Sequence, residues 1–188
     1  PRMNDPRFHL RSRRRFLRQA GVLAAGGAAW ATSARAAPAP DARHLALVHT
    51  HTRERIELVY AVGPAYAPQA LHALNHFLRD HYSGEVGAID PALFDLLYRV
   101  RRELGGDRPF EVISGYRCPT TNERLRQTRG GGVASRSLHL QGRAIDVRLP
   151  GVALSDLRDA GLSLRAGGVG FYPSGPFVHL DTGRVRSW

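Results

Sequence analysis

The order of the hydrophobic patterns along the chain constrains its fold more than any other feature of the sequence. Residues 44–51 and 55–61 are two apolar runs with β-branched residues, separated by three residues, and their side chains would alternate between two faces, which predicts a β-hairpin. Two helical patterns follow, one from Pro68 and one from Pro91, and each repeats apolar residues along one face. The rest of the chain predicts short strands at residues 109–114, 144–148, 169–172 and 177–181, with short helices at 122–128 and 154–160.

Strands that follow helices through short connections are typical of an α+β domain. We therefore expect one domain in which an antiparallel sheet carries helices packed on one side. The roughly 150 residues that follow the N-terminal segment are enough for a single buried core. We place a linker at residues 37–42 and the domain at 43–188. The single cysteine, Cys118, excludes an intramolecular disulfide and a CxxC zinc site.

Residues 1–36 have the three-part pattern of an export signal. The basic string SRRRFLR at residues 12–18 precedes a glycine-rich apolar stretch at 21–31 and the small residues Ala34 and Ala36. The string resembles the twin-arginine consensus, which predicts export by the twin-arginine translocase to the periplasm or cell envelope and cleavage after Ala36. A basic disordered tail is the alternative. The apolar stretch is too short for a stable transmembrane segment, which needs about 20 apolar residues.

The net charge of the chain, +11, comes mostly from this N-terminal segment. All 27 basic residues are arginine, and eight of them lie in residues 1–36 together with one acidic residue. The remaining chain keeps 19 basic and 15 acidic residues and a net charge of +4. A basic chain often binds nucleic acid. Because the excess charge belongs to an export signal, we expect no nucleic-acid partner.

Two of the expected strands place polar side chains on the face opposite to their apolar residues. At residues 144–148 the sequence AIDVR directs Asp146 away from its apolar neighbours, and at 177–181 the sequence FVHLD does the same with His179 and Asp181. A carboxylate flanked by core residues is costly to bury unless it is paired or binds a metal. Gly142 permits a turn that folds Asp146 back toward His139.

His139, Asp146 and His179 together offer two imidazoles and a carboxylate, which are the ligands that catalytic zinc uses with a fourth position open to water. The other histidine patterns are weaker. His72 and His76 have the spacing of an HExxH helix but lack its glutamate. For that pair, and for residues 49 and 51 on one strand, we expect structural or surface roles.

Four segments in combination resemble a known family. These are SGYR at residues 114–117, SxHxxGxAxD at 137–146, GGVGFYP at 167–173 and FVHLDTG at 177–183. Together they resemble the murein endopeptidase K family, which belongs to the wider group of zinc D-Ala-D-Ala peptidases and hedgehog-like folds. The resemblance implies a zinc enzyme that hydrolyses peptide cross-links of peptidoglycan with a metal-bound water as nucleophile. It also implies that His139, Asp146 and His179 bind the zinc.

The resemblance leaves the other site roles more open. It implies that Arg117 stabilises the developing oxyanion, with a salt bridge that holds its loop as the alternative. Tyr116 is expected to bind substrate, and Ser137 either does so or caps its turn. Tyr172 and Trp188 are expected to pack in the core rather than to line the substrate groove.

The general base is where the sequence departs from the wider group. Many of those peptidases place an acidic residue three positions before the last histidine, where this chain has Pro176. Asp181 is the candidate substitute, and orientation of a metal ligand is its alternative role. The missing acid also supports a second hypothesis, a non-catalytic zinc-containing module that binds peptidoglycan. The sequence leaves open whether the cross-link joins D-alanine to diaminopimelate or two diaminopimelates.

Overall fold

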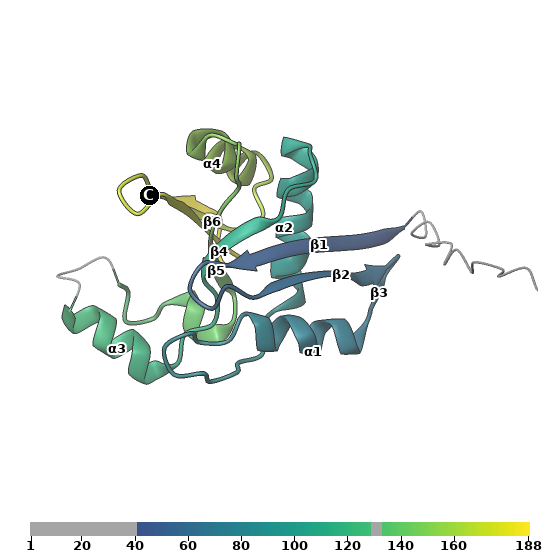
Figure 1. The fold of residues 1–188 in the computed structure, drawn as a ribbon. Helices are drawn as coiled ribbons and strands as arrows, with labels where there is room; N and C mark the ends of the chain where they lie inside the picture. The colour runs from purple at the N-terminus through teal and green to yellow at the C-terminus, as the bar shows by residue number, and fades with distance from the viewer. Residues whose placement is uncertain (1–40, 129–132) are drawn as a thin grey trace, which may run out of the picture. The chain divides into compact units, whose positions relative to one another are not determined.

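A computed structural model of the chain describes residues 41–128 and 133–188 (Figure 1). The expected export signal and nearly all of the expected linker lie outside the described residues. Within them, no helix is both long and apolar enough to cross a membrane. The first strand begins at Ala42, at the end of the expected linker.

Eight strands form one mixed sheet in the order β3-β2-β1-β4-β5-β7-β6-β8. An α+β architecture is therefore confirmed, but the expectation of a purely antiparallel sheet is wrong, because β1 pairs with β4 and β6 with β8 in parallel. Two helices, α1 (Pro68–Phe77) and α2 (Pro91–Leu104), lie between β2 and β4 in the chain, and this long crossover lets β4 run parallel to β1. The strands are β1 (Ala42–His49), β2 (Arg55–Val62), β3 (Ala65–Tyr66), β4 (Phe110–Ser114), β5 (Ala144–Arg148), β6 (Gly168–Tyr172), β7 (Phe177–Asp181) and β8 (Arg186–Ser187).

The helices are α1 (Pro68–Phe77), α2 (Pro91–Leu104), α3 (Pro119–Thr128) and α4 (Leu154–Ser163), with a 3₁₀ turn η1 (Leu138–Gln141). The residues that were expected to begin and end α2 lie at its two ends. The Asp90 side chain accepts a hydrogen bond from the backbone of Ala92, Pro91 occupies the first turn, and Gly105 ends the helix with a φ of 71°. Helix α3 starts three residues earlier than predicted.

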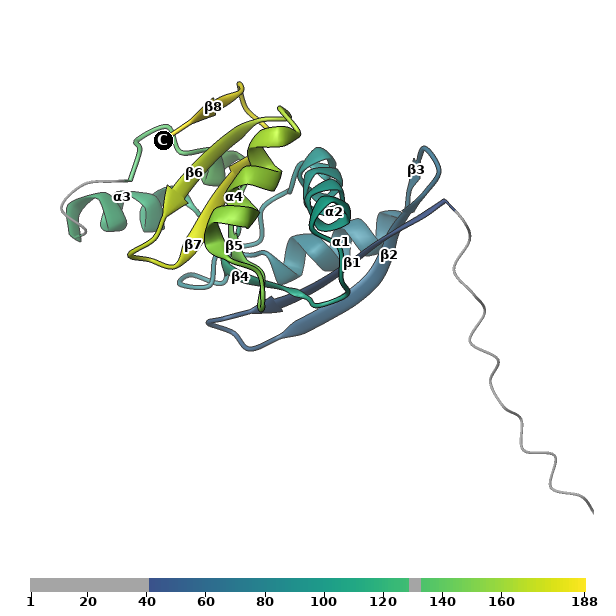
Figure 2. The same ribbon diagram turned by 90° about the horizontal axis from the view of Figure 1, so that it is seen from above.

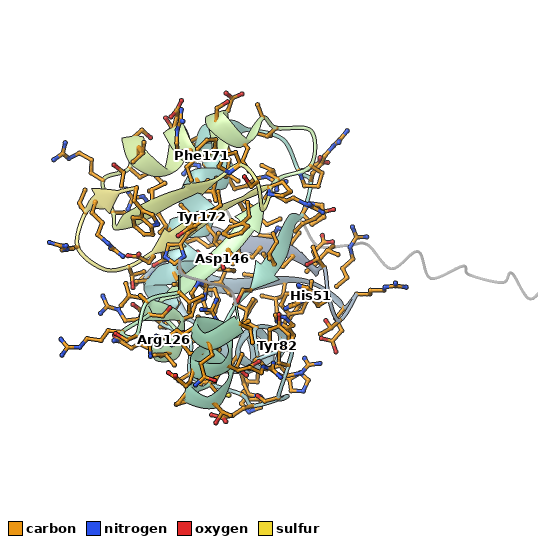
Figure 3. All side chains as sticks on the ribbon, turned by 90° about the vertical axis from the view of Figure 1, so that its left-hand side faces the viewer. His51, Tyr82, Arg126, Asp146, Phe171 and Tyr172 are labelled. Atoms are coloured by element: carbon orange, nitrogen blue, oxygen red, sulfur yellow. The ribbon has the colours of Figure 1, made fainter. Side chains whose placement is uncertain are left out.

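Helices α1, α2 and α4 cover one face of the sheet, where a single apolar core lies (Figure 2). Alternation along the strands decides which residues enter it. Val147 pairs with Val112 on one side and Val178 on the other, and Leu180 packs beside Gly161 of α4. Since Asp146 and His179 alternate with these core residues, their side chains lie on the opposite face of the sheet. That face is the one shown in Figure 3, which labels Asp146 and Tyr172.

Candidate metal centre

Strand pairing brings Asp146 and His179 together. The two residues are direct partners in the antiparallel register of β5 and β7, so their side chains leave the sheet on the same face. The Nδ1 atom of His179 lies 2.9 Å from Oδ1 of Asp146. Both residues are buried, with 8% and 7% of their surfaces exposed. The sheet itself therefore fixes two members of the cluster.

The turn before β5 supplies the third member. His139 lies in η1, and Gly142 follows the turn with a φ of 64°, in the left-handed region. The Nε2 atom of His139 lies 3.3 Å from Oδ1 of Asp146 and 3.3 Å from Nδ1 of His179. Its Nδ1 atom lies 2.7 Å from the carbonyl oxygen of Gly115, which makes Nδ1 the protonated nitrogen. Nε2 faces the other two residues and is the nitrogen that binds a metal when the metal replaces its proton.

His179 is oriented in the same way by Asp181. The Nε2 atom of His179 lies 3.1 Å from Oδ2 of Asp181, on the side of the ring away from Asp146. Asp181 is fully buried and accepts hydrogen bonds from the backbone of Gly168 and Gly183 and from the guanidinium of Arg186. A carboxylate that accepts Nε2–H leaves Nδ1 of His179 as the donor atom for a metal.

The charges of the cluster favour a cation between the three residues. Burial alone would raise the pKa of Asp146, but the neighbouring charge and hydrogen bonds of His139 and His179 hold it below its usual range. Burial would likewise lower the pKa of His179, yet hydrogen bonds to Asp146 and Asp181 raise it to about 9. The site thus stabilises positive charge strongly, which a divalent ion supplies when it replaces the proton.

The donor set fits a metal ion. The three candidate ligand atoms lie within 4.8 Å of one another, and no other group of three or more His, Cys, Asp or Glu residues in the described chain has this property. Two imidazole nitrogens and one carboxylate oxygen suit zinc. A cleft of about 740 Å³ opens onto the cluster, which leaves room for water and substrate at a fourth position. The ligand type and the open side are those of catalytic rather than structural metal sites.

The cleft is rich in arginine. Arg117, Arg136 and Arg186 line it, and Asp146 is the only acidic side chain among its described lining residues. Arg117 lies 3.9 Å from Oδ2 of Asp146 and donates hydrogen bonds to Asn122 and Ser114. The cleft therefore combines the candidate metal ligands with positive charge and hydrogen-bond donors.

The structure brings some of the other predicted residues to this cleft and keeps others away. Arg117 and Ser137 line it, and the side chain of Ser137 makes no capping hydrogen bond to η1. Tyr116 does not line it. Its ring packs over Gly87 and its hydroxyl donates to Glu85. The lining of this cleft gives no support to a substrate contact of Tyr116, and that role stays a prediction.

Asp181 is absent from the lining of the cleft as well, since its carboxylate is buried behind His179. Tyr172 and Trp188, in contrast, line the cleft, so the expectation that they pack in the core is wrong. The ring centre of Trp188 lies 5.2 Å from that of His179. The register explains the position of Tyr172, because it is two residues from Gly170, the partner of His179, and so shares its face.

An α+β domain with a His-Asp-His cluster at the base of a cleft has the architecture of a metal-dependent hydrolase, and the family comparison agrees. The family model of Peptidase_M15_2, described as peptidoglycan L,D-endopeptidase MepK, matches residues 37–188. The chain belongs to this family of metallopeptidases.

Two relatives show how far the similarity extends. The peptidoglycan L,D-endopeptidase MepK of Escherichia coli K12 is 46% identical over 173 residues, which cover 89% of this chain and 94% of the relative. The probable peptidoglycan L,D-endopeptidase MepK of Haemophilus influenzae is 39% identical over 150 residues, covering 79% and 80%. No solved structure matches the chain significantly. The expected likeness to the hedgehog fold therefore stays a prediction.

Proposed function

We propose that the protein is a zinc-dependent endopeptidase that hydrolyses peptide cross-links of peptidoglycan. The convergence of three donor atoms at the base of an open cleft carries this proposal: Nε2 of His139, Oδ1 of Asp146 and Nδ1 of His179. The names of the relatives support the substrate class. When bound, zinc supplies an activated water at neutral pH and polarises the scissile carbonyl.

Residues of the chain would supply three further functions: stabilising the oxyanion, binding substrate and orienting a metal ligand. The guanidinium of Arg117, held by Ser114 and Asn122 next to Asp146, is placed to stabilise negative charge that develops on the carbonyl oxygen. Ser137 lines the cleft, its side chain does not cap η1, and its hydroxyl binds substrate there. Asp181 keeps His179 in the tautomer that offers Nδ1. We assign it this positioning role rather than that of a base, since its carboxylate does not reach the cleft.

Digestion of purified sacculi tests the proposed hydrolysis. The domain is incubated with sacculi in zinc and in a chelator, and the muropeptides are separated by chromatography. We expect cross-linked dimers to disappear in zinc and to persist in the chelator. Persistence of dimers in both samples would favour the alternative function, a non-catalytic module that binds peptidoglycan, which Pro176 in place of an acidic residue supports.

We further propose that the twin-arginine translocase exports the chain to the periplasm or cell envelope. The string at residues 12–18 and the small residues before position 37 support this route, and the family match begins at residue 37. Replacement of both Arg13 and Arg14 by lysine should retain uncleaved protein in the cytoplasm, measured by fractionation and N-terminal sequencing. Unchanged export of that variant, or a mature terminus other than Ala37, would contradict the proposal.

A further inference from the structure

Tyr172 occupies a fixed position on the wall of the cleft. It lies in β6 opposite Phe177 of β7, and the two rings stack with centres 4.7 Å apart and planes 18° apart. The Nε1 atom of Trp188 donates a hydrogen bond of 2.7 Å to the hydroxyl oxygen of Tyr172. Ring stacking and this hydrogen bond hold the tyrosine from two sides, so its hydroxyl is presented at a defined point of the cleft.

The hydrogen bond from Trp188 also determines what the hydroxyl can do. An indole nitrogen only donates, so the oxygen of Tyr172 is the acceptor and its own proton is left for another partner. Among residues 41–128 and 133–188, that hydroxyl donates to no protein group. Since Tyr172 lines the cleft, its proton is available to a bound molecule.

Trp188 is itself locked beside the candidate metal ligands. Gly170, the strand partner of His179, makes room for the indole, because a Cβ atom at position 170 would lie 2.7 Å from the Cε2 atom of Trp188. The guanidinium of Arg186 lies 4.7 Å from the centre of the indole ring on which it stacks. His179, Trp188 and Tyr172 thus form one continuous wall, and the hydroxyl of Tyr172 lies one indole away from the ligand His179.

The charge of the cleft indicates which chemical group of a bound molecule would accept a hydrogen bond from this hydroxyl. Arg117, Arg136 and Arg186 supply positive charge, and the described lining contains no carboxylate other than that of Asp146. Arg117 lies beside Asp146 and Arg186 is paired with the buried Asp181, but the three guanidinium groups outnumber the one carboxylate of the described lining. This excess of positive charge and donors favours a carboxylate of the bound molecule. Stem peptides of peptidoglycan carry free carboxylates, which makes them suitable occupants.

We propose that Tyr172 is a substrate-binding residue whose hydroxyl, oriented by Trp188, donates a hydrogen bond to a free carboxylate of the stem peptide. This inference rests on the proposed function and specifies the part of the substrate that the cleft recognises. It makes Tyr172 a determinant of specificity for the free carboxylate over its amide.

The test compares kcat/KM on two cross-linked stem-peptide dimers, one with free carboxylates and one in which they are amidated. Tyr172→Phe retains the stacking on Phe177 but removes the donor. We expect it to lower kcat/KM on the free acid about 10- to 100-fold, as loss of a hydrogen bond to a charged group does, with little change on the amide. The control is Tyr98→Phe on α2, outside the cleft, which should match the wild type on both dimers.

A binding measurement separates this inference from the proposed function. Calorimetric titration with a linear stem tetrapeptide, as free acid and as amide, reports recognition without hydrolysis. Tyr172→Phe should weaken binding of the acid about 10-fold or more and leave the amide unchanged. Equal binding by wild type and Tyr172→Phe, or an equal loss on acid and amide, would overturn the inference. A wild type that binds the acid selectively but cuts neither dimer would overturn the proposed hydrolysis alone.

Discussion

The Nε2 atom of His179 lies 3.1 Å from a carboxylate oxygen of Asp181, on the opposite side of the ring from the Nδ1 atom that faces Asp146. This contact connects the candidate metal ligand to the C-terminal strand, because the same carboxylate binds the guanidinium of Arg186. Hydrogen bonds to this buried carboxylate outweigh the effect of burial and keep the pKa of Asp181 below its usual range. It is therefore ionised whenever the site can hold a metal.

Replacement of Asp181 by alanine should weaken metal binding rather than abolish the chemistry. Loss of a group that orients a metal-binding histidine typically costs about 10- to 100-fold in affinity. We expect low activity at limiting zinc and substantial recovery at saturating zinc, with bound metal measured in the same samples. Asp159→Ala on the exposed face of α4 is the control. Full zinc occupancy with no hydrolysis would instead identify Asp181 as the general base.

Replacement of Arg117 by glutamine should reduce hydrolysis while the metal stays bound. A donor aimed at a developing oxyanion contributes about 100- to 1,000-fold to kcat, and glutamine cannot supply the positive charge. Parallel measurements of kcat and zinc content test this, with Arg158→Gln as the surface control. If the variant loses metal in proportion to its activity, Arg117 acts by holding its loop and Asp146 in place.

Gly142 should tolerate alanine much less well than Gly84, although both have a positive φ. A Cβ atom at position 142 would lie 1.9 Å from the carbonyl oxygen of Ala88, whereas position 84 is open. We expect Gly84→Ala to lose about 1–2 kcal/mol of unfolding free energy from backbone strain alone. Gly142→Ala adds a further cost of about 1–3 kcal/mol for overpacking. Urea denaturation measures both, and equal losses would contradict the close approach seen here.

A cluster of histidines away from the cleft should make the fold sensitive to acid. His49 is fully buried, and its Nε2 atom has no hydrogen-bond partner among the described residues; the same is true of Nε2 of His81. Burial, reinforced by the charge of His51, lowers the pKa of each to about 4. The other groups that act on them are Glu54 and Arg79 near His49, and His49, Asp80 and Arg117 near His81.

An unfolded histidine titrates near pH 6.5, so between about pH 6.5 and pH 4 the unfolded chain binds more protons than the folded one. Stability should therefore fall as the pH drops through this range, by about 2 kcal/mol at pH 5 from His49 alone. His49→Asn keeps a hydrogen-bond acceptor without titrating and should remove that part of the loss. Urea unfolding at pH 7.5 and pH 5 measures it, with exposed His72→Asn as control. An unchanged pH dependence in His49→Asn would contradict this role.

Local patterns in the sequence were enough to predict much of the fold. The alternating segments at residues 44–51 and 55–61 form the hairpin of β1 and β2, and the cap residues of α2 act where their positions indicated. Asp146 and His179 could be placed on one face because a strand alternates with a period of two. His139 followed because Gly142 permits the turn. Each of these inferences uses a pattern within one short segment, whereas the pairing of β5 with β7 that brings Asp146 to His179 lies outside such patterns.

Relationships between distant segments could not be predicted in the same way. The parallel pairing of β1 with β4 depends on how two helices return the chain, which no short pattern encodes. The orientation of Tyr116 away from the cleft depends on packing against Gly87, and the contact of Trp188 with Tyr172 depends on the pairing of β8 with β6. The net charge of the chain did not predict the positive charge of the cleft either. That charge comes from three arginines, Arg117, Arg136 and Arg186, which only the fold brings together.

Titration of zinc into metal-free protein tests the central claim most directly, with bound metal and cross-link hydrolysis measured in the same samples. If His139, Asp146 and His179 hold the catalytic ion, hydrolysis should rise in proportion to bound zinc and reach its maximum at one zinc per chain. Asp146→Asn, which removes the ligand charge at nearly constant volume, should bind far less zinc and hydrolyse correspondingly less. Full hydrolysis in metal-free protein, or wild-type zinc binding and activity in Asp146→Asn, would contradict the account.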